Sequence, residues 1–580
     1  MEDRVMSSST EVMSHEETRR YKWNQIPWAT VEKNVFKLQK RIYQATRREE
    51  TVKVHKLQRL LVKSKCAKLL AVRRVTQDNS GKKTAGIDGV KKLTPKERVQ
   101  LVEDIDWNKE PKPVRRIYIP KAGKNEVRPL GIPVIEDRAK QALVKLAMEP
   151  EWEAKFEPNS YGFRAGRAAH DAIEAIYKAI GRKVGGSFVL DADIKGCFDN
   201  IDHDALLRKV NTYPRLRKII KGWLKAGILD KGVFQKSDAG TPQGGVVSSL
   251  LANIALDGME EHVKDRLDED LFQSTKARIQ REGLGAGGAN RKQARSAMSI
   301  IRYADDFVVI HRDRDIVEKA QTIISDWLAE MGLELKPSKT RIAHTMENLD
   351  GKAGFDFLGC EVRQYRDKTT KLGHKTIIKP SKDAAKRHLA KIGEVVERHK
   401  GMNQIALILK LNPIIKGWSR YHCTTVARKT FEYLKHRMYE KLWRWACFNH
   451  SHKGKIWIKD RYFRKHGGHN WRFMTASGEF LMEHTDHKII RHAMINPSKS
   501  PYDGDWAYWS KRMGREPTIS PRIARLMKKQ EGKCGRCELF LTSCDLVEVH
   551  HIDGNHKNNK ETNLTLLHRH CHDQAHGVAA

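Results

Sequence analysis

The stretch at 299–312 reads SIIRYADDFVVIHR and sets two adjacent acidic residues, Asp305 and Asp306, inside a run of apolar and β-branched residues. β-Branched residues favour strands, so the run predicts two strands joined by a turn. Neighbouring carboxylates repel, and away from water each raises the pKa of the other. The pair therefore either sits at a solvated hairpin tip, where aspartate is common, or binds positive charge such as Mg²⁺.

A second apolar run, FVLDADIKGCFDN at 188–200, also delivers a carboxylate, because its expected strand ends at Asp193. Two strands that bring Asp193 to the Asp305–Asp306 pair would build one carboxylate cluster. Such a cluster can hold two Mg²⁺ ions about 4 Å apart. The charge of the ions would offset the repulsion between the carboxylates. This arrangement suits the transfer of a nucleotide from a triphosphate to a hydroxyl group.

The composition points to a polyanionic partner. The 580 residues include 109 Lys and Arg against 71 Asp and Glu, a net charge of +38. Nucleic acid is the favoured partner, with an anionic membrane surface as the alternative. No apolar run is long enough to span a bilayer, so no membrane partner is expected. The polar first residues lack the apolar core of a signal peptide, which predicts an intracellular protein.

The order of patterns along the chain predicts an α+β core followed by a helical domain. Residues 30–75 carry leucines at helical spacing among many Lys and Arg. Residues 113–134 alternate like two strands around a basic turn. The Gly-rich, basic stretch at 270–297 predicts a flexible insert. Residues 383–450 read as helical, basic and rich in Trp, with most of the aromatic side chains filling a helical core.

Seven motifs follow one another in an order that resembles the reverse transcriptase of group II intron-encoded proteins. LNPIIKGWSRYH at 411–422 resembles the maturase motif that follows in this family, and 38–89 resembles its N-terminal extension. In chain order, the seven are RPLGIPVIEDRAKQ (128–141), SYGFRAGRAAHDAI (160–173), DIKGCFDNIDH (193–203), GTPQGGVVSSLLAN (240–253), YADD (303–306), GLELKPSKT (332–340) and FDFLGCEV (355–362).

The resemblance implies a multidomain α+β protein with a right-hand polymerase fold. The implied divisions are a disordered tail (1–20), an N-terminal extension (21–90), the fingers and palm of the polymerase (91–378), a helical thumb or maturase domain (379–475), a DNA-binding linker region (476–530) and a C-terminal nuclease domain (531–580).

The resemblance also implies roles at the polymerase site. Asp193, Asp305 and Asp306 would ligate two Mg²⁺ ions. Lys121 and Arg128 would clamp the triphosphate. Phe198 would be the steric gate that excludes ribonucleotides, and Gln243 would contact the incoming nucleotide. Lys339 would support the palm site. In so basic a chain, ordinary surface charge is an equal alternative for Lys121 and Arg128. The family usually has proline where this chain has Ser249, a departure that leaves the carboxylates untouched.

Four metal-ligand residues crowd the last fifty positions: Cys534, Cys537, His568 and Cys571. Thiolate and imidazole ligands in two close pairs suit a tetrahedral structural Zn²⁺. So small a domain has little core of its own, so zinc would hold it together. Cys544 is the substitute ligand if His568 does not serve. A plain zinc-binding module without activity is the alternative to an enzyme.

The motifs EVHHIDG at 548–554, NLTLL at 563–567 and CH at 571–572 resemble the HNH nucleases, which fold as a ββα unit around one divalent metal. The resemblance implies that His551 is the general base that activates water. It implies that His550 and His572 ligate one Mg²⁺, and that Asn563 orients the hairpin and His551.

Together the resemblances imply a reverse transcriptase, maturase and DNA endonuclease that act in intron mobility by target-primed reverse transcription. The implied partners are the group II intron RNA, double-stranded target DNA, an RNA template with a DNA primer, and dNTPs. Three alternatives are weighed: a splicing factor without polymerase activity, a non-mobile reverse transcriptase of the retron type, and a bare homing nuclease. The three aspartates argue against a splicing factor without polymerase activity. The maturase motif and the nuclease module argue against the retron type, and a bare homing nuclease would leave residues 80–370 unexplained.

Overall fold

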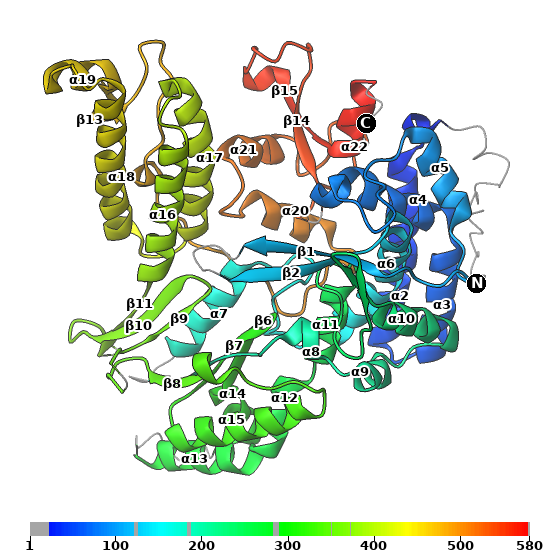
Figure 1. The fold of residues 1–580 in the computed structure, drawn as a ribbon. Helices are drawn as coiled ribbons and strands as arrows, with labels where there is room; N and C mark the ends of the chain where they lie inside the picture. The colour runs from blue at the N-terminus through cyan, green and yellow to red at the C-terminus, as the bar shows by residue number, and fades with distance from the viewer. Residues whose placement is uncertain are drawn as a thin grey trace, which may run out of the picture.

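The structure, a computed structural model, describes residues 22–120, 126–181, 187–281, 289–349, 351–371, 373–543 and 545–577. Two candidate residues, Lys121 and Cys544, lie outside the described residues. The described parts combine helices with several small sheets, so the α+β prediction is confirmed (Figure 1). No helix in these ranges is long and apolar enough to cross a membrane.

A four-stranded antiparallel sheet carries the three candidate aspartates. Its strand order is β6-β7-β3-β8, with β6 (Ser299–Tyr303), β7 (Asp306–His311), β3 (Phe188–Asp193) and β8 (Arg341–His344). Successive side chains point to opposite faces. Leu190 and Val309 join the core that contains α15 (Arg314–Ala329), whereas Val189 and Val308 join the core that contains α7 (Ala169–Ile180). Both faces are buried, which explains the nearly continuous apolar runs.

A second sheet lies beside the N-terminal helices. Its order is β2-β1-β4-β5, with β1 (Val114–Pro120), β2 (Val127–Ile132), β4 (Ile228–Asp230) and β5 (Val233–Gln235). Strands β1 and β2 are antiparallel and pair Ile119 with Arg128. The two strands predicted within 113–134 are therefore confirmed.

The helices of the N-terminal region pack on α6 (Ile135–Lys155). They are α2 (Trp28–Arg47), α3 (Thr51–Lys63) and α4 (Lys65–Arg73). Leu57 and Leu61, four residues apart, lie on one buried face of α3. The charged residues occupy the opposite face, so the predicted basic, amphipathic helical region is confirmed.

The prediction of a flexible insert at 270–297 is wrong for most of its length. This part of the chain forms α13 (Asp268–Arg281) and α14 (Arg291–Ala297), and residues 282–288 lie outside the described residues. Arg295 donates hydrogen bonds to Asp265 at 2.8 Å and to Glu261 at 2.7 Å. The insert is therefore held by ion pairs between residues about thirty positions apart, which its composition did not reveal.

Three long helices form the region that matches the expected thumb: α16 (Lys382–Arg398), α17 (Gln404–His422) and α18 (Arg428–Asn449). The three-stranded sheet β11-β10-β9 precedes them, with β9 (Phe355–Phe357), β10 (Cys360–Arg366) and β11 (His374–Pro380). Trp445, Tyr462 and Phe463 are buried in the core of this region. They fill a helical core, as predicted for most of the aromatic residues.

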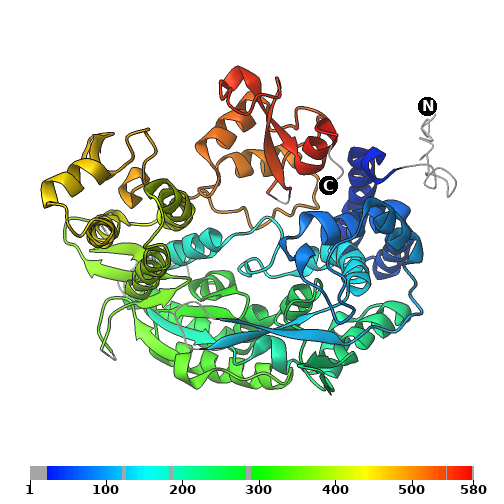
Figure 2. The ribbon, with the colours of Figure 1, turned by 45° about the horizontal axis from the view of Figure 1, so that its top comes forward.

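The region 476–530 is more ordered than a linker. It contains α20 (Trp506–Gly514) and α21 (Pro521–Lys529), and Trp509 is only 1% exposed. The final hairpin and helix follow: β14 (Val547–His551), β15 (Leu564–His568) and α22 (Arg569–Ala575). Together with the preceding residues from 531 onward, they form the C-terminal module, which lies beside the N-terminal helices (Figures 1 and 2). There Gln574 donates a hydrogen bond to the carbonyl of Ile26 at 2.8 Å.

Candidate functional sites

The structure brings the three predicted carboxylates together. Asp193 ends β3 and Asp306 begins β7, and the two residues are direct partners across the antiparallel pair. Asp305 lies in the turn between β6 and β7, where Ala304 adopts a left-handed φ of 59°. The stretch at 299–312 is thus a hairpin, but its tip is not fully solvated. Asp193 is buried, and Asp305 and Asp306 are each half-buried.

The cluster holds more negative charge than its surroundings balance. Burial and the charges of Asp305 and Asp193 raise the pKa of Asp306 to about 7. Burial also raises the pKa of Asp305. Lys339 Nζ donates a hydrogen bond to Asp193 Oδ2 at 2.5 Å. Burial opposes the charge on Lys339, but the hydrogen bond to Asp193 outweighs burial and raises the Lys339 pKa. One lysine for three carboxylates leaves a donor set that fits hard divalent cations.

A buried network fixes the turn that carries Asp305. The backbone N–H of Tyr161 donates to the Arg302 carbonyl at 2.9 Å, and Arg302 Nη1 donates to Asn253 Oδ1 at 3.2 Å. Asn253 Nδ2 donates in turn to the Gly162 carbonyl at 2.8 Å. A Cβ on Gly162 would lie 2.3 Å from the Ala304 nitrogen. Three separate sequence motifs therefore meet at this turn, and only glycine fits at position 162.

The predicted nucleotide-binding residues lie on several different elements. Phe198 is half-buried in α8 (Cys197–Asn200), and its ring lies 6.0 Å from that of Phe163. The Gln243 carbonyl accepts a hydrogen bond from the Gly131 N–H at 2.7 Å, which docks its turn on β2. Arg128 is exposed on β2, and its charge acts to lower the pKa of Asp305. Lys121 lies outside the described residues.

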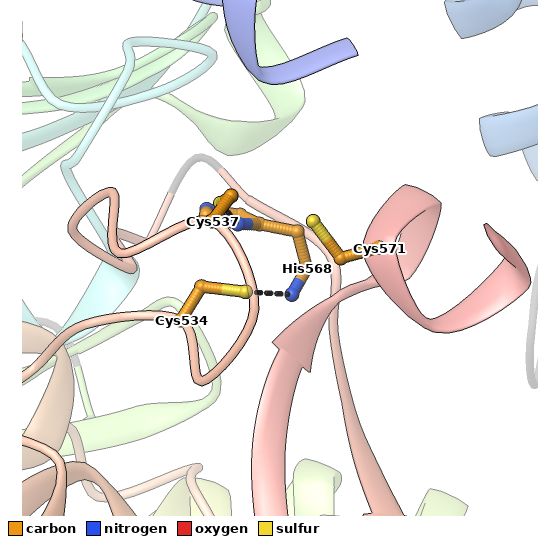
Figure 3. A group of neighbouring side chains, drawn as sticks. All are labelled: Cys534, Cys537, His568 and Cys571. Carbon is orange, nitrogen blue, oxygen red and sulfur yellow. Dashed lines mark hydrogen bonds between the residues drawn. The ribbon is translucent and has the colours of Figure 1, made fainter. Parts of the chain in front are cut away.

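The C-terminal module gathers four metal-ligand residues at one point: Cys534, Cys537, His568 and Cys571. Their ligand atoms all lie within 4.8 Å of one another (Figure 3). The Cys537 Sγ lies 3.4 Å from His568 Nδ1, and the backbone N–H of His568 donates to Cys534 Sγ at 3.4 Å. Three thiols and one imidazole at this spacing fit a tetrahedral zinc ion. His568 takes part in the group, while Cys544 lies outside the described residues.

A second group in the module consists of His550, His572 and His576, whose ligand atoms also lie within 4.8 Å of one another. His550 Nδ1 lies 3.1 Å from His576 Nε2, and His572 Nδ1 lies 3.2 Å from Glu548 Oε2. His550 and His572 were predicted as ligands, but His576 was missed. The signal that identifies it is the i,i+4 spacing from His572, because His576 directly follows α22 and lies one turn beyond His572.

His551 ends β14 next to this group. Its Nε2 atom is buried and has no hydrogen-bond partner among the described residues. Asn563 holds the loop that follows His551. Its Oδ1 accepts from the Asp553 N–H at 3.0 Å, and its Nδ2 donates to Asp553 Oδ1 at 2.8 Å and to the Asn558 carbonyl at 2.9 Å. The contacts of Asn563 thus suit the predicted orienting role.

Three parts of the chain match known families. Residues 119–362 match "Reverse transcriptase (RNA-dependent DNA polymerase)", residues 23–105 match "N-terminal domain of reverse transcriptase", and residues 385–463 match "Group II intron, maturase-specific domain". These matched regions end at residue 463, before the C-terminal module begins.

Individual relatives agree with these matches. "Protein YkfC" of Escherichia coli (strain K12) is 31% identical over 349 residues, which cover 56% of this chain and 87% of that protein. "Group II intron-encoded protein LtrA" of Lactococcus lactis subsp. cremoris is 31% identical over 339 residues, 50% of this chain and 54% of that protein. "Maturase-like protein 1" of Euglena gracilis is 26% identical over 400 residues, 68% of this chain and 76% of that protein. The chain thus spans most of the first relative and about half of the second.

Proposed function

This chain belongs to the family of group II intron-encoded reverse transcriptases and maturases, and from this premise we propose that Asp193, Asp305 and Asp306 are its site of RNA-directed DNA synthesis. The observation that carries the proposal is the pairing of β3 with β7, which sets Asp193 opposite Asp306. A splicing factor without polymerase activity would have no use for three half-buried or buried carboxylates at one point.

In this proposal the carboxylates hold two Mg²⁺ ions. When bound, the ions would supply activation of the primer 3′-hydroxyl and stabilisation of the charge on the leaving pyrophosphate. A bond forms between the primer oxygen and the α-phosphorus of a dNTP, and the bond to the β-phosphate oxygen breaks. The hydrogen bond from Lys339 fixes the rotamer of Asp193. The exposed charge of Arg128 attracts the triphosphate, with Lys121 proposed as its partner in the clamp.

Phe198 and Gln243 are proposed to select the nucleotide. The half-buried ring of Phe198 packs edge-on against Phe163, and from this position it can exclude a ribose 2′-hydroxyl by contact. Gln243 is followed by Gly244, whose φ of 121° strains any other residue, and this glycine lets the backbone approach a ligand closely.

Primer extension on an RNA template with dNTPs and Mg²⁺ tests the polymerase proposal. We expect synthesis by the natural protein and a loss of about 10²–10³-fold in Asp305→Asn, the range seen when one charge-stabilising group is removed. Asp326→Asn, which changes an exposed aspartate on α15, is the matched control and should extend normally. A natural protein that binds RNA but makes no DNA would refute the proposal.

We also propose DNA nicking by the C-terminal module. The supporting observation is the group of three histidines beside His551, whose Nε2 has no partner among the described residues. His550, His572 and His576 would hold one divalent metal ion, which would supply charge stabilisation at the scissile phosphate. Three imidazoles suit a transition-metal ion better than the Mg²⁺ that the resemblance implies, because Mg²⁺ prefers oxygen ligands. His551 would take a proton from the attacking water, since neutral imidazole is a base near physiological pH. Zn²⁺ at the cysteine group would hold the fold of the module.

A nicking assay on supercoiled target DNA separates this activity from DNA synthesis. His551→Ala should lose nicking and keep primer extension, because the base is removed and the carboxylate cluster is untouched. His452→Ala, a histidine outside the module, is the control. If His551→Ala nicks DNA at the natural rate, His551 is not the general base of this reaction.

The two activities join in one proposed cycle. The maturase region binds group II intron RNA through its basic helices, helps the RNA fold and splice, and remains bound to it. The RNA inserts into one strand of double-stranded target DNA, with DNA contacts from region 476–530. The module nicks the other strand, and the new 3′-hydroxyl primes DNA synthesis. This cycle takes place inside a bacterium or an organelle and needs no membrane.

A further inference from the structure

A cavity of about 400 Å³ lies where the polymerase core, the N-terminal helices and the C-terminal region meet. Apart from Phe163, whose ring packs against Phe198, none of its residues belongs to the sites described above. The residues that matter for its chemistry are Arg74, Lys145, Phe163, Arg167, Arg515 and Ser543.

The walls of the cavity are fixed by contacts between distant parts of the chain. Arg512 Nη2 donates to both oxygens of Asp171, at 2.8 and 2.7 Å, and His492 Nε2 lies 2.9 Å from Asp171 Oδ1. The Trp509 ring packs against Gly166, where an added Cβ would lie 2.4 Å from the ring. Because Gly166 and Trp509 pack so closely, region 476–530 is held tightly against the polymerase core.

The cavity carries uncompensated positive charge. Arg164 and Arg512 in its wall pair with buried carboxylates. Among the described residues, Arg74, Arg167 and Arg515 form no direct ion pair with a carboxylate, although the charges of Glu153 and Asp171 act on Arg167 from further away. Burial, together with the charge of Arg164, lowers the pKa of Arg167 to about 10. Arg167 is half-buried, and a partly desolvated cation without a direct ion pair is stabilised when an anion joins it, whereas Arg74 and Arg515 are exposed at the mouth of the cavity.

Two acidic residues also line the cavity but do not reverse its sign. Glu149 accepts a hydrogen bond from Tyr502 at 2.8 Å and lies 3.6 Å from Lys145, so its charge is shared. Glu516 is half-buried. The carboxylates that line the cavity or pair with its arginines are Glu149, Glu153, Asp171 and Glu516. The cationic side chains in its walls are Arg74, Lys145, Arg164, Arg167, Arg512 and Arg515. Six cations against four carboxylates leave the cavity with a net positive charge.

The cavity borders the polymerase site through Phe163. This residue is 53% exposed and has a left-handed φ of 58°, and its ring meets Phe198 edge-on at 6.0 Å. An exposed aromatic ring beside cations suits a nucleic-acid base that stacks while its phosphates bind the cations.

We propose that this cavity binds the unpaired template strand next to the polymerase site. Arg74, Arg167 and Arg515 contact its phosphates, and Phe163 stacks on a base. The phosphates of an RNA template and of a DNA strand offer the same chemistry. The inference rests on the proposed polymerase function for the identity of the strand, but the binding itself does not depend on synthesis.

The test measures binding of primer–template duplexes without dNTPs or Mg²⁺. The probes are a blunt duplex and the same duplex with a ten-nucleotide 5′ template overhang of RNA or of DNA. The variant is Arg74→Gln with Arg515→Gln, since both side chains are exposed and the fold does not need their charges. The control is Arg314→Gln with Lys319→Gln, which removes two exposed charges from α15.

We expect the variant to bind overhang duplexes roughly fivefold more weakly or worse, with the salt slope reduced by about 1.4, since each single-strand phosphate contact contributes about 0.7. Blunt duplexes should bind as they do to the control. A loss with the RNA overhang alone assigns the cavity to an RNA template, and equal losses assign it to either strand. Affinities equal to those of the control, or equal losses on blunt duplexes, would overturn the proposal. If the variant shows the overhang-specific loss but the natural protein cannot extend primers, the polymerase proposal is refuted and the strand-binding proposal stands.

Discussion

Three carboxylates share one partly buried site, where burial and mutual repulsion raise the pKa of Asp306 to about 7. Asp193, Asp305 and Asp306 could be predicted because carboxylates in apolar strands are costly unless a ligand compensates for them. His576 was missed, because its i,i+4 spacing from His572 identifies a shared face only once a helix is known to form in that part of the chain. The Arg302–Asn253 contact was equally hidden, since it joins residues that are separated by a long stretch of chain.

Lys339→Ala should slow primer extension about tenfold, because a hydrogen bond to a charged group is worth about 1.5–3 kcal/mol and Lys339 is 44% exposed, so solvent weakens it. Single-turnover rates should fall with little change in RNA affinity. Lys276→Ala, which removes an exposed lysine from α13, serves as the control. An unchanged rate would show that Lys339 does not position Asp193.

Glu157→Gln should stabilise the protein at pH 8 and change little near pH 5. Burial and the charge of Asp257 raise the pKa of Glu157 from 4.5 to about 7. Between about pH 4.5 and pH 7, Glu157 loses its proton in the unfolded chain but keeps it in the folded protein. The natural protein therefore loses up to about 3 kcal/mol of stability as the pH rises through this window. Thermal unfolding at both pH values, with the exposed Glu330→Gln as control, checks this. A larger gain at pH 5 than at pH 8 would contradict it.

At the scale of elements, local patterns predicted the strands and helices of the core but not the ion pairs and close contacts that hold them in place. Alternation and apolar runs identified β1, β2, β3, β6 and β7. Composition alone misjudged 270–297, because the ion pairs of Arg295 decide its structure. The turn of the β6–β7 hairpin depends on another motif, since Gly162 lets the segment 160–163 lie against it.

Gly162→Ala should reduce primer extension by roughly 10²-fold, because its Cβ would displace the Ala304 backbone and misplacing catalytic groups by about 1 Å costs this much. Gly401→Ala is the matched control, since no atom lies within 4 Å of its added Cβ. Circular dichroism should show both variants folded. Natural activity in Gly162→Ala would mean that the turn is not held by this contact.

At the scale of the whole molecule, the position of region 476–530 was the largest gap in the prediction. Its composition resembles that of a linker, yet Arg512 reaches Asp171 and Trp509 reaches Gly166. Contacts between residues more than three hundred positions apart leave no local pattern. Region 476–530 is therefore held against the polymerase core, rather than tethered to it.

Cys571→Ser should lose bound zinc and open the C-terminal module to protease, while primer extension continues. The four ligands lie in one group, and a small domain depends on its metal to fold. Zinc analysis should find about one ion per natural chain, as a closed four-ligand site requires. Cys447→Ser, outside the group, should keep it. Full zinc content in Cys571→Ser would contradict the ligand assignment.

The most direct measurement is single-turnover incorporation of one deoxynucleotide on an RNA template by Asp193→Asn and Asp306→Asn. These residues face each other across β3 and β7, so each replacement removes one charge from the same cluster. We predict that both variants bind the primer–template normally and lose incorporation by at least about 10²-fold. Incorporation at the natural rate in either variant would contradict the claim that this cluster makes DNA.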